Sequence, residues 1–267
     1  MKRRQFLKSS AVAGIGVATA ALNAAAADKT DITNPEFYEL RLYHLRRGPK
    51  TKLFDDFYRE AALPAMNRAG IGPVGVFSVV YGPDSPTMYV LIPHKSLDSF
   101  ADSNDRVRAD ADYQKLGADF INCPATDPAY IRTESFLLRA FSGFPKLAVP
   151  AAAAGNKARI FELRTYESHS KKANKKKIGM FNDGEISIFH RTGLRPVFFG
   201  ETLVGSKMPS LTYMLTFENM AEREKNWAAF IADPDWKKMS TTPGYTDGEI
   251  VSNITNLILK PAAYSQI

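Results

Sequence analysis

Hydrophobic positions along the chain alternate between short strand-like runs and helix-like stripes, in an order that occurs twice. Aromatic and branched residues are concentrated over 36–44 and again over 159–166, which predicts a strand at each place. After each run, apolar residues recur every three or four positions, which predicts helices over 50–68 and 175–191. Each half of the chain therefore begins with a strand followed by a helix.

The remaining elements also follow the same order in both halves. Segments rich in turn residues separate two pairs of predicted strands, 74–81 from 87–92 and 197–204 from 211–217. Helical regions are expected next, over 96–116 and 221–239, and then the last strands, over 130–141 and 249–260. This βαββαβ order predicts two ferredoxin-like α+β units, in which helices cover one face of each sheet and the other face needs a partner.

A sequence repeat supports this division. Tyr38-Glu39-Leu40-Arg41-Leu42-Tyr43 returns 123 residues later as Phe161-Glu162-Leu163-Arg164-Thr165-Tyr166. The same offset relates three further positions, Gly70 to Gly193, Pro73 to Pro196 and Asp112 to Asp235. Agreement at several separated places indicates two copies of one folding unit.

We expect two domains, over 35–141 and 159–264, joined by a linker over 142–158 that is rich in Pro, Ala and Gly. Such a linker would allow the uncovered faces of the two sheets to meet within one chain. The product would be a monomeric, pseudo-dimeric α+β barrel. The alternative is a homodimer, in which each unit pairs with its counterpart in a second chain.

Residues 1–27 have the features of a targeting segment. A basic start, Lys2-Arg3-Arg4-Gln5-Phe6-Leu7-Lys8, precedes an uncharged apolar stretch and then small residues. The paired arginines resemble the twin-arginine export signal of bacteria, the alternatives being an ordinary secretory signal or a retained anchor. We expect a signal peptide cleaved near Ala27 and a periplasmic or secreted protein. The apolar stretch is shorter than the ~20 residues of a membrane span, so we expect no transmembrane segment after cleavage.

The net charge and the cysteine content bear on nucleic-acid binding and on disulfide formation. The formal net charge is +7, and it falls to +3 without the four basic residues of the signal (7 − 4). Because no reading motif accompanies this modest charge, we expect no nucleic-acid partner. Cys123 is the single cysteine, which excludes a disulfide within the chain.

Several segments resemble those of the NIPSNAP family. They are the strand Tyr38–Tyr43, the segment Gly70–Phe77 and the run Asn226–Lys237. The resemblance implies two tandem NIPSNAP domains of the dimeric α+β barrel group, some of whose members bind haem or oxidise aromatic compounds. It implies no catalytic residues. One departure is visible, because Gly75-Val76-Phe77 in the first copy corresponds to Phe198-Phe199-Gly200 in the second.

Strand alternation suggests candidate site residues. Successive side chains point to opposite faces, so Glu39, Arg41 and Tyr43 share one face of the first strand. We assign the opposite, apolar face to the helices, which places these three residues, and by repetition Glu162, Arg164 and Tyr166, inside the barrel. There they are candidates for binding a polar or aromatic ligand. The competing interpretation is structural, with Glu39 and Arg41 satisfying each other's charge.

No spacing typical of a metal site, dinucleotide fingerprint, phosphate loop or nucleophile elbow is present. His44 and His94, near the ends of predicted strands, are the candidates for binding a metal or haem, which no motif requires. The catalytic residues are unknown.

Three functions remain open. The first is binding of a small hydrophobic or aromatic ligand in the barrel, a function that a dry, packed barrel interior would exclude. The second is a haem-dependent or cofactor-free monooxygenase, and the third is a structural or protein-interaction module.

Overall fold

A computed structural model of the chain describes residues 34–82, 85–155 and 157–267. The expected signal peptide, over 1–27, lies outside the described residues. The described residues form one compact unit, which contains both copies of the sequence repeat. We call these copies repeat 1 (35–141) and repeat 2 (159–264). Within the described ranges, no helix is both long and apolar enough to cross a membrane.

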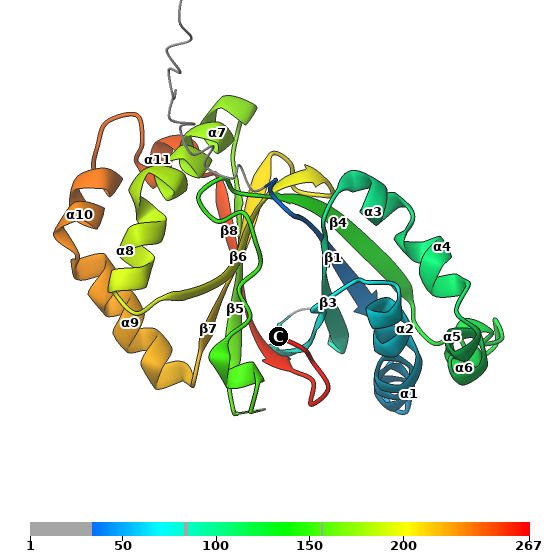
Figure 1. The fold of residues 1–267 in the computed structure, drawn as a ribbon. Helices are drawn as coiled ribbons and strands as arrows, with labels where there is room; N and C mark the ends of the chain where they lie inside the picture. The colour runs from blue at the N-terminus through cyan, green and yellow to red at the C-terminus, as the bar shows by residue number, and fades with distance from the viewer. Residues whose placement is uncertain (1–33, 83–84, 156) are drawn as a thin grey trace, which may run out of the picture. The chain divides into compact units, whose positions relative to one another are not determined.

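Eight antiparallel strands close into one barrel (Figure 1). The strands of repeat 1 are β1 (Phe37–His44), β2 (Gly75–Tyr81), β3 (Thr87–His94) and β4 (Arg132–Ala140). Those of repeat 2 are β5 (Ile160–Glu167), β6 (Arg195–Val204), β7 (Ser210–Phe217) and β8 (Asn253–Pro261). The order around the barrel is β1-β3-β2-β8-β5-β7-β6-β4. The repeats meet where β2 pairs with β8 and β4 pairs with β6, so the barrel closes within one chain, and the predicted α+β barrel is confirmed.

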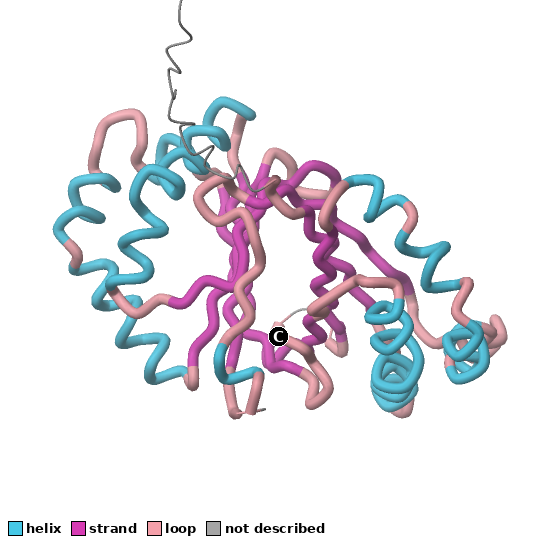
Figure 2. The backbone as a smooth tube through the Cα atoms, in the orientation of Figure 1, coloured by secondary structure: helices cyan, strands magenta, loops and turns pink. Residues whose placement is uncertain are grey.

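Helices lie outside the barrel, those of repeat 1 on one side and those of repeat 2 on the other (Figures 1 and 2). Repeat 1 has α1 (Lys50–Phe57), the π-helical segment η1 (Tyr58–Ala62), α2 (Leu63–Arg68), α3 (Leu97–Ala101), α4 (Ser103–Arg108), α5 (Ala111–Leu116) and α6 (Ala118–Ile121). Repeat 2 has α7 (Lys171–Met180), the π-helical segment η3 (Phe181–Glu185), α8 (Ile186–Arg191), α9 (Met220–Ala232), α10 (Pro234–Ser240) and α11 (Asp247–Ile250). A short 3₁₀ helix, η2 (Ala151–Ala153), lies between the repeats.

Several boundaries differ from the expected ones for local reasons. Helix α7 begins at Lys171 rather than at 175, because the Ser170 side chain accepts a hydrogen bond from the Ala173 amide and caps the helix. Strand β8 begins at Asn253 rather than near 249, because Thr246 and Glu249 form a capping box for α11. The continuous helices α1-η1-α2 and α7-η3-α8 each contain a π-helical turn, at positions related by the offset. Pro64 follows the turn in repeat 1, but the helix of repeat 2 contains no proline, so a proline is not needed for the turn.

The barrel interior is filled by apolar side chains from both repeats. Its buried members include Tyr38, Leu40, Leu91 and Leu138 from repeat 1 and Phe161, Leu163, Phe198 and Met214 from repeat 2. The side chain of Ile267 joins the same cluster and is completely buried. This shared interior, stabilised by removal of apolar surface from water, unites the repeats into one unit.

Gly75 and Phe198, which distinguish the two copies in sequence, both belong to this interior. A Cβ atom at Gly75 would lie 2.5 Å from the ring of Phe77, so glycine at 75 leaves room for that ring. In repeat 2 the aromatic residue is Phe198 and the glycine is Gly200, where a Cβ would lie 2.8 Å from Leu138. Each copy therefore places one phenylalanine and one glycine in the interior, in exchanged order along the strand.

Candidate functional site

Glu39, Arg41 and Tyr43 lie on the outer face of β1, under the helices, and not inside the barrel as predicted. Tyr43 belongs to the core between β1 and the repeat 1 helices, whereas Tyr38, Leu40 and Leu42 belong to the barrel interior. The same inversion holds in repeat 2, where Tyr166 packs with the helices and Leu163 lies inside. The physical reason is that two sheets meeting face to face exclude water, which favours the faces without charged pairs there. The face that carries Glu39, Arg41 and Tyr43 lies under helices instead, which can supply polar partners for these side chains and leave an opening to solvent.

A pocket of about 550 Å³ lies between this outer face and the helices of repeat 1. Glu39, Tyr43 and Tyr58 are buried parts of its wall, while Asn104 and Ser135 are exposed. The volume is within the ~300–1,000 Å³ typical of small-molecule sites. The candidate site residues of repeat 1 therefore line a cavity, on the opposite side of the sheet from the one expected.

Glu39 and Arg41 form a bidentate ion pair in this wall. Arg41 Nε donates to Glu39 Oε1 at 2.8 Å and Nη2 donates to Oε2 at 2.9 Å, and Ser135 Oγ adds a third bond at 2.7 Å to Oε1. Burial alone would raise the pKa of Glu39, but Arg41 and Ser135 outweigh burial and lower it. The structural pairing that the sequence suggested thus exists. Arg41 nevertheless keeps 17% of its side chain exposed and also borders the pocket.

An aromatic group forms the apolar part of the pocket. The ring of Tyr43 lies edge-on to Phe54, Tyr58, Phe120 and Tyr130 at centroid distances of 5.2–6.1 Å. Tyr58 Oη donates to Tyr43 Oη at 3.1 Å, and burial together with Tyr43 holds the pKa of Tyr58 well above its usual value. The site therefore combines a charged pair, neutral phenol groups and aromatic surface.

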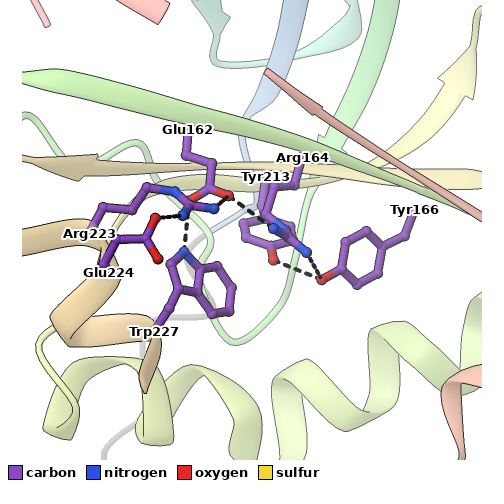
Figure 3. Close-up of polar contacts among 7 residues, drawn as sticks. All are labelled: Glu162, Arg164, Tyr166, Tyr213, Arg223, Glu224 and Trp227. Atoms are coloured by element: carbon purple, nitrogen blue, oxygen red, sulfur yellow. Dashed lines mark hydrogen bonds and ion pairs between the residues drawn. The ribbon is translucent and has the colours of Figure 1, made fainter. Parts of the chain in front are cut away.

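In repeat 2 the equivalent carboxylate is surrounded by side chains of the chain itself (Figure 3). Glu162 accepts from Arg164 Nη1 at 2.9 Å, from Arg223 at 2.7 and 2.9 Å, and from Trp227 Nε1 at 2.7 Å. The guanidinium of Arg164 lies 4.7 Å from the Trp227 ring centre and donates to Tyr166 Oη at 3.2 Å. Glu162, Arg164 and Tyr166 are thus brought together, and Trp227 and Arg223 pack against Glu162 and Arg164. Arg164 keeps 15% of its side chain exposed, close to the value for Arg41.

A buried ion pair fills more of the helix–sheet space in repeat 2. Lys177 is completely buried, 3.3 Å from both Glu185 Oε2 and Asp247 Oδ1, and its ammonium lies over the rings of Tyr166, Phe181 and Trp236. Burial raises the pKa of Glu185 to about 7, against the opposing effect of Lys177. The 123-residue offset places Phe54 and Ala62 at these two positions in repeat 1, and Ala62 lines the pocket.

The two helical layers share one ion pair at positions related by the 123-residue offset, which supports the offset as a guide to structural equivalents. Arg68 Nε donates to Asp110 Oδ2 at 2.6 Å, and 123 residues later Arg191 Nε donates to Asp233 Oδ2 at 2.9 Å. Both aspartates also cap the helix that follows them. The difference at the pocket therefore has two sources. One is side-chain identity at equivalent positions, and the other is α6, which lines the pocket with Phe120 and Ile121 and has no helical counterpart in the described residues of repeat 2.

Neither candidate histidine fits an axial haem ligand in this pocket, because neither lines it. His44 shares the inward strand face of Leu42, and its ring lies 3.0 Å from Glu134 and 3.2 Å from Thr87. His94 has no exposed side-chain surface, and its Nε2 is 3.9 Å from Glu39 Oε2. Burial lowers the pKa of His94 to about 4, although Glu39 opposes the shift. No group of three or more potential metal-binding side chains occurs in the ranges that the structure describes.

Two other hollows lie near the seam between β2 and β8. The larger, about 880 Å³, is bordered by Arg59, Lys157 and Lys260, all exposed. The smaller, about 410 Å³, touches Arg223 and is otherwise lined by Val80, Ile160, Met220, Asn256 and Ile258. The larger hollow is also lined by the buried Arg159 and by Tyr264. Neither hollow includes the Glu–Arg–Tyr residues of β1 or β5, which in repeat 1 line the 550 Å³ pocket.

Three residues important to this site were not recognised in the sequence: Tyr58, Asn104 and Trp227. Tyr58 and Asn104 are separated from Arg41 along the chain, and only the folded helices bring them to the pocket. A signal did exist for the last two. The repeat offset aligns Asn104 with Trp227, a replacement of a small polar residue by the largest aromatic one on a shared face.

Comparisons with known proteins agree with this architecture. The family model described as NIPSNAP matches residues 38–122 and 161–266. No curated protein matches the chain. A proposed monooxygenase from Lactobacillus acidophilus is similar at a TM-score of 0.58 and 8% identity, covering 85% of this chain and 94% of that one. A proposed monooxygenase from Fusobacterium nucleatum is similar at 0.56 and 6%, covering 85% and 93%.

One solved structure of a NIPSNAP-like domain protein, from Burkholderia xenovorans, is 20% identical to this chain. It covers 40% of this chain and 88% of its own length, at a TM-score of 0.36. At the low identities of the two monooxygenase-like structures, the likeness establishes a shared fold.

Proposed function

The chain belongs to the NIPSNAP family, and from the geometry of repeat 1 we propose that it binds a small, largely apolar ligand in the pocket beside Arg41. The observation that carries the proposal is the contrast between the repeats. Repeat 1 leaves a pocket of about 550 Å³ beside its Glu–Arg pair, whereas in repeat 2 the side chains of Trp227 and Arg223 bond to the equivalent glutamate. Buried apolar side chains from both repeats occupy the barrel interior, which argues against the ligand site expected there, and we therefore assign the ligand to the space under the helices of repeat 1.

The chemistry of the pocket favours binding over proton transfer. Because Arg41 and Ser135 outweigh the effect of burial, Glu39 has a lowered pKa and is ionised but weakly basic at neutral pH. The guanidinium of Arg41 retains its charge throughout the physiological range. These groups orient a polar substituent, while Phe57, Phe120 and Tyr43 contact the apolar body of the ligand.

The test compares ligand binding by wild type and by Arg41→Ala, using a panel of small aromatic compounds and isothermal titration calorimetry. A bond to a charged group contributes ~1.5–3 kcal/mol, so we expect Arg41→Ala to weaken binding by about 10–100-fold. Arg195→Ala, which removes an exposed arginine paired with Glu222 in repeat 2, is the matched control and should bind like wild type. Equal binding by wild type and Arg41→Ala would place the ligand elsewhere.

A second candidate function is oxygenation of the bound ligand. The specific observation in its favour is the likeness in fold to the two proposed monooxygenases. Oxygen consumption with a ligand identified by calorimetry is the decisive measurement. Consumption that is lost in Arg41→Ala and retained in Arg195→Ala would establish the enzyme, and binding without consumption would leave a binding protein.

A further inference from the structure

Asn104 and Trp227 occupy equivalent positions and approach equivalent partners. They are 123 residues apart, and the paired contacts Arg68–Asp110 and Arg191–Asp233 fix the same alignment of the two helical layers. Asn104 Oδ1 accepts from Arg41 Nη2 at 3.3 Å, and the ring of Trp227 lies 4.7 Å from the Arg164 guanidinium. A small amide in repeat 1 thus corresponds to an indole in repeat 2.

The indole of Trp227 is held much as a bound ligand would be (Figure 3). One contact is a cation–π interaction with Arg164, and the other is the bond from Nε1 to Glu162 Oε2 at 2.7 Å. Both partners are present in repeat 1 as Arg41 and Glu39. Repeat 2 therefore displays, with its own side chain, the contacts that a ligand could make in repeat 1.

The carboxylate of repeat 1 has acceptor capacity left for such a contact. Glu162 accepts four hydrogen bonds, two on each oxygen, which matches the roughly four lone-pair sites of a carboxylate. Among the residues that the structure describes, Glu39 accepts two bonds on Oε1 and one on Oε2. His94 Nε2, 3.9 Å from that second oxygen, is beyond hydrogen-bond distance.

We propose that the repeat 1 pocket takes a planar aromatic ligand that carries an N–H or O–H donor on its ring, as indoles and phenols do. The ring lies against Arg41, in the place that Trp227 occupies in repeat 2, and its donor bonds to Glu39. This inference rests on the proposed function, because it names the class of ligand for the same pocket. It adds that one hydrogen bond to Glu39 selects the ligand.

The first test uses wild-type protein and two probes, indole and 1-methylindole, in calorimetric titrations. The probes share the ring system, but only indole has the N–H donor. Loss of a hydrogen bond to a charged acceptor costs ~1.5–3 kcal/mol, so we expect 1-methylindole to bind at least tenfold more weakly, with indole at one site per chain. Equal affinities would overturn the inference and leave the proposed function standing.

The second test exchanges the two equivalent residues. Asn104→Trp should place an indole over Arg41 and abolish binding of added indole, while Trp227→Asn should open the second site and raise the stoichiometry from one to two. Circular dichroism and melting temperature show whether each variant is folded. A folded Asn104→Trp that still binds indole, or a folded Trp227→Asn that binds one equivalent, would overturn the inference.

Titrations with the wider panel of aromatic compounds distinguish failure of this inference from failure of the proposed function. In one outcome, wild type fails to bind indole but still binds another compound of the panel, and that binding is lost in Arg41→Ala. This result would support the proposed function and overturn the inference that the ligand carries an N–H or O–H donor on its ring. Wild type that binds no compound of the panel would overturn both proposals.

Discussion

The outer faces of β1 and β5 carry the same Glu–Arg–Tyr motif in different surroundings. In repeat 1 the motif borders a pocket, and its glutamate accepts from one arginine and one serine. In repeat 2 the glutamate accepts from two arginines and a tryptophan, and Lys177 and Glu185 are buried nearby. The motif itself is therefore a structural unit of the fold, and the residues that differ around it decide whether it faces a cavity.

The contrast also concerns what each repeat contributes to the whole molecule. Repeat 2 uses its polar residues to hold its own helices against the sheet, so their loss should reduce stability. Repeat 1 leaves part of this bonding capacity unused, so equivalent changes there should affect ligand binding more and stability less. The following experiments test this division.

The largest effect on stability is expected from Lys177→Ala. The substitution leaves Glu185 buried without its cation, and breaking a buried pair in this way costs about 3–5 kcal/mol in free energy of unfolding. Urea denaturation at alkaline pH measures the loss, because the pKa of Glu185 is about 7 and removal of Lys177 raises it further, so that at neutral pH the carboxyl would be protonated and uncharged.

A double variant provides the matched control for this change. Lys177→Phe combined with Glu185→Ala transfers the residues of repeat 1, Phe54 and Ala62, to repeat 2. Replacing both partners of a buried pair by apolar groups is often close to neutral, so the double variant should recover most of the loss. A double variant as unstable as Lys177→Ala would contradict the idea that an uncompensated charge causes the loss.

The next effect compares Glu162→Gln with Glu39→Gln. The first removes the charge that two arginines and an indole share, and we expect a loss of about 3 kcal/mol in the free energy of unfolding. The second removes a charge that accepts from one arginine and one serine only, so about 1–2 kcal/mol is expected. Urea denaturation of the two variants side by side gives the comparison. Equal losses in the free energy of unfolding would show that the Glu39 charge contributes as much to stability as the Glu162 charge, despite its fewer hydrogen bonds.

The sequence predicted the architecture well, because it depends on features that repeat along the chain. The hexapeptide at Tyr38 and its copy at Phe161, with the same order of elements after each, specify two βαββαβ units. The assignment of faces was wrong because alternation separates the faces of a strand without saying which one meets another sheet. That choice depends on the packing of fourteen buried side chains from both repeats in the barrel interior.

The alternation of residues in the strands could not predict the pocket, because the pocket depends on small side chains in the helices, where repeat 2 has larger ones. Ala62 and Asn104 look unremarkable alone, and their importance appears only beside Glu185 and Trp227. Comparing the two copies position by position over the helices, and not only over the strands, would have found both. The full burial of Lys177 also had no signal, because it lies within a run of lysines that is typical of an exposed helix.

The smallest effect is expected where the repeats agree, at Asp110 and Asp233. Hydrogen bonds from Arg68 and Arg191 lower the pKa of each aspartate to about 2, from 3.8. The unfolded chain then binds more protons than the folded one between about pH 4 and pH 2, so this stabilisation is present above pH 4 and is lost as the pH falls toward 2. Asp110→Asn and Asp233→Asn should each flatten the decline of stability over that range, and by the same amount.

Urea denaturation at several values between pH 2 and pH 6 measures these slopes. Asparagine retains the helix cap, so the comparison isolates the carboxylate charge. Unequal slopes for Asp110→Asn and Asp233→Asn would mean that the repeats differ beyond the pocket. Equal slopes, together with unequal effects of Glu39→Gln and Glu162→Gln, would show that the Arg–Asp contact is equivalent in the two copies while the surroundings of the Glu–Arg–Tyr motif are not.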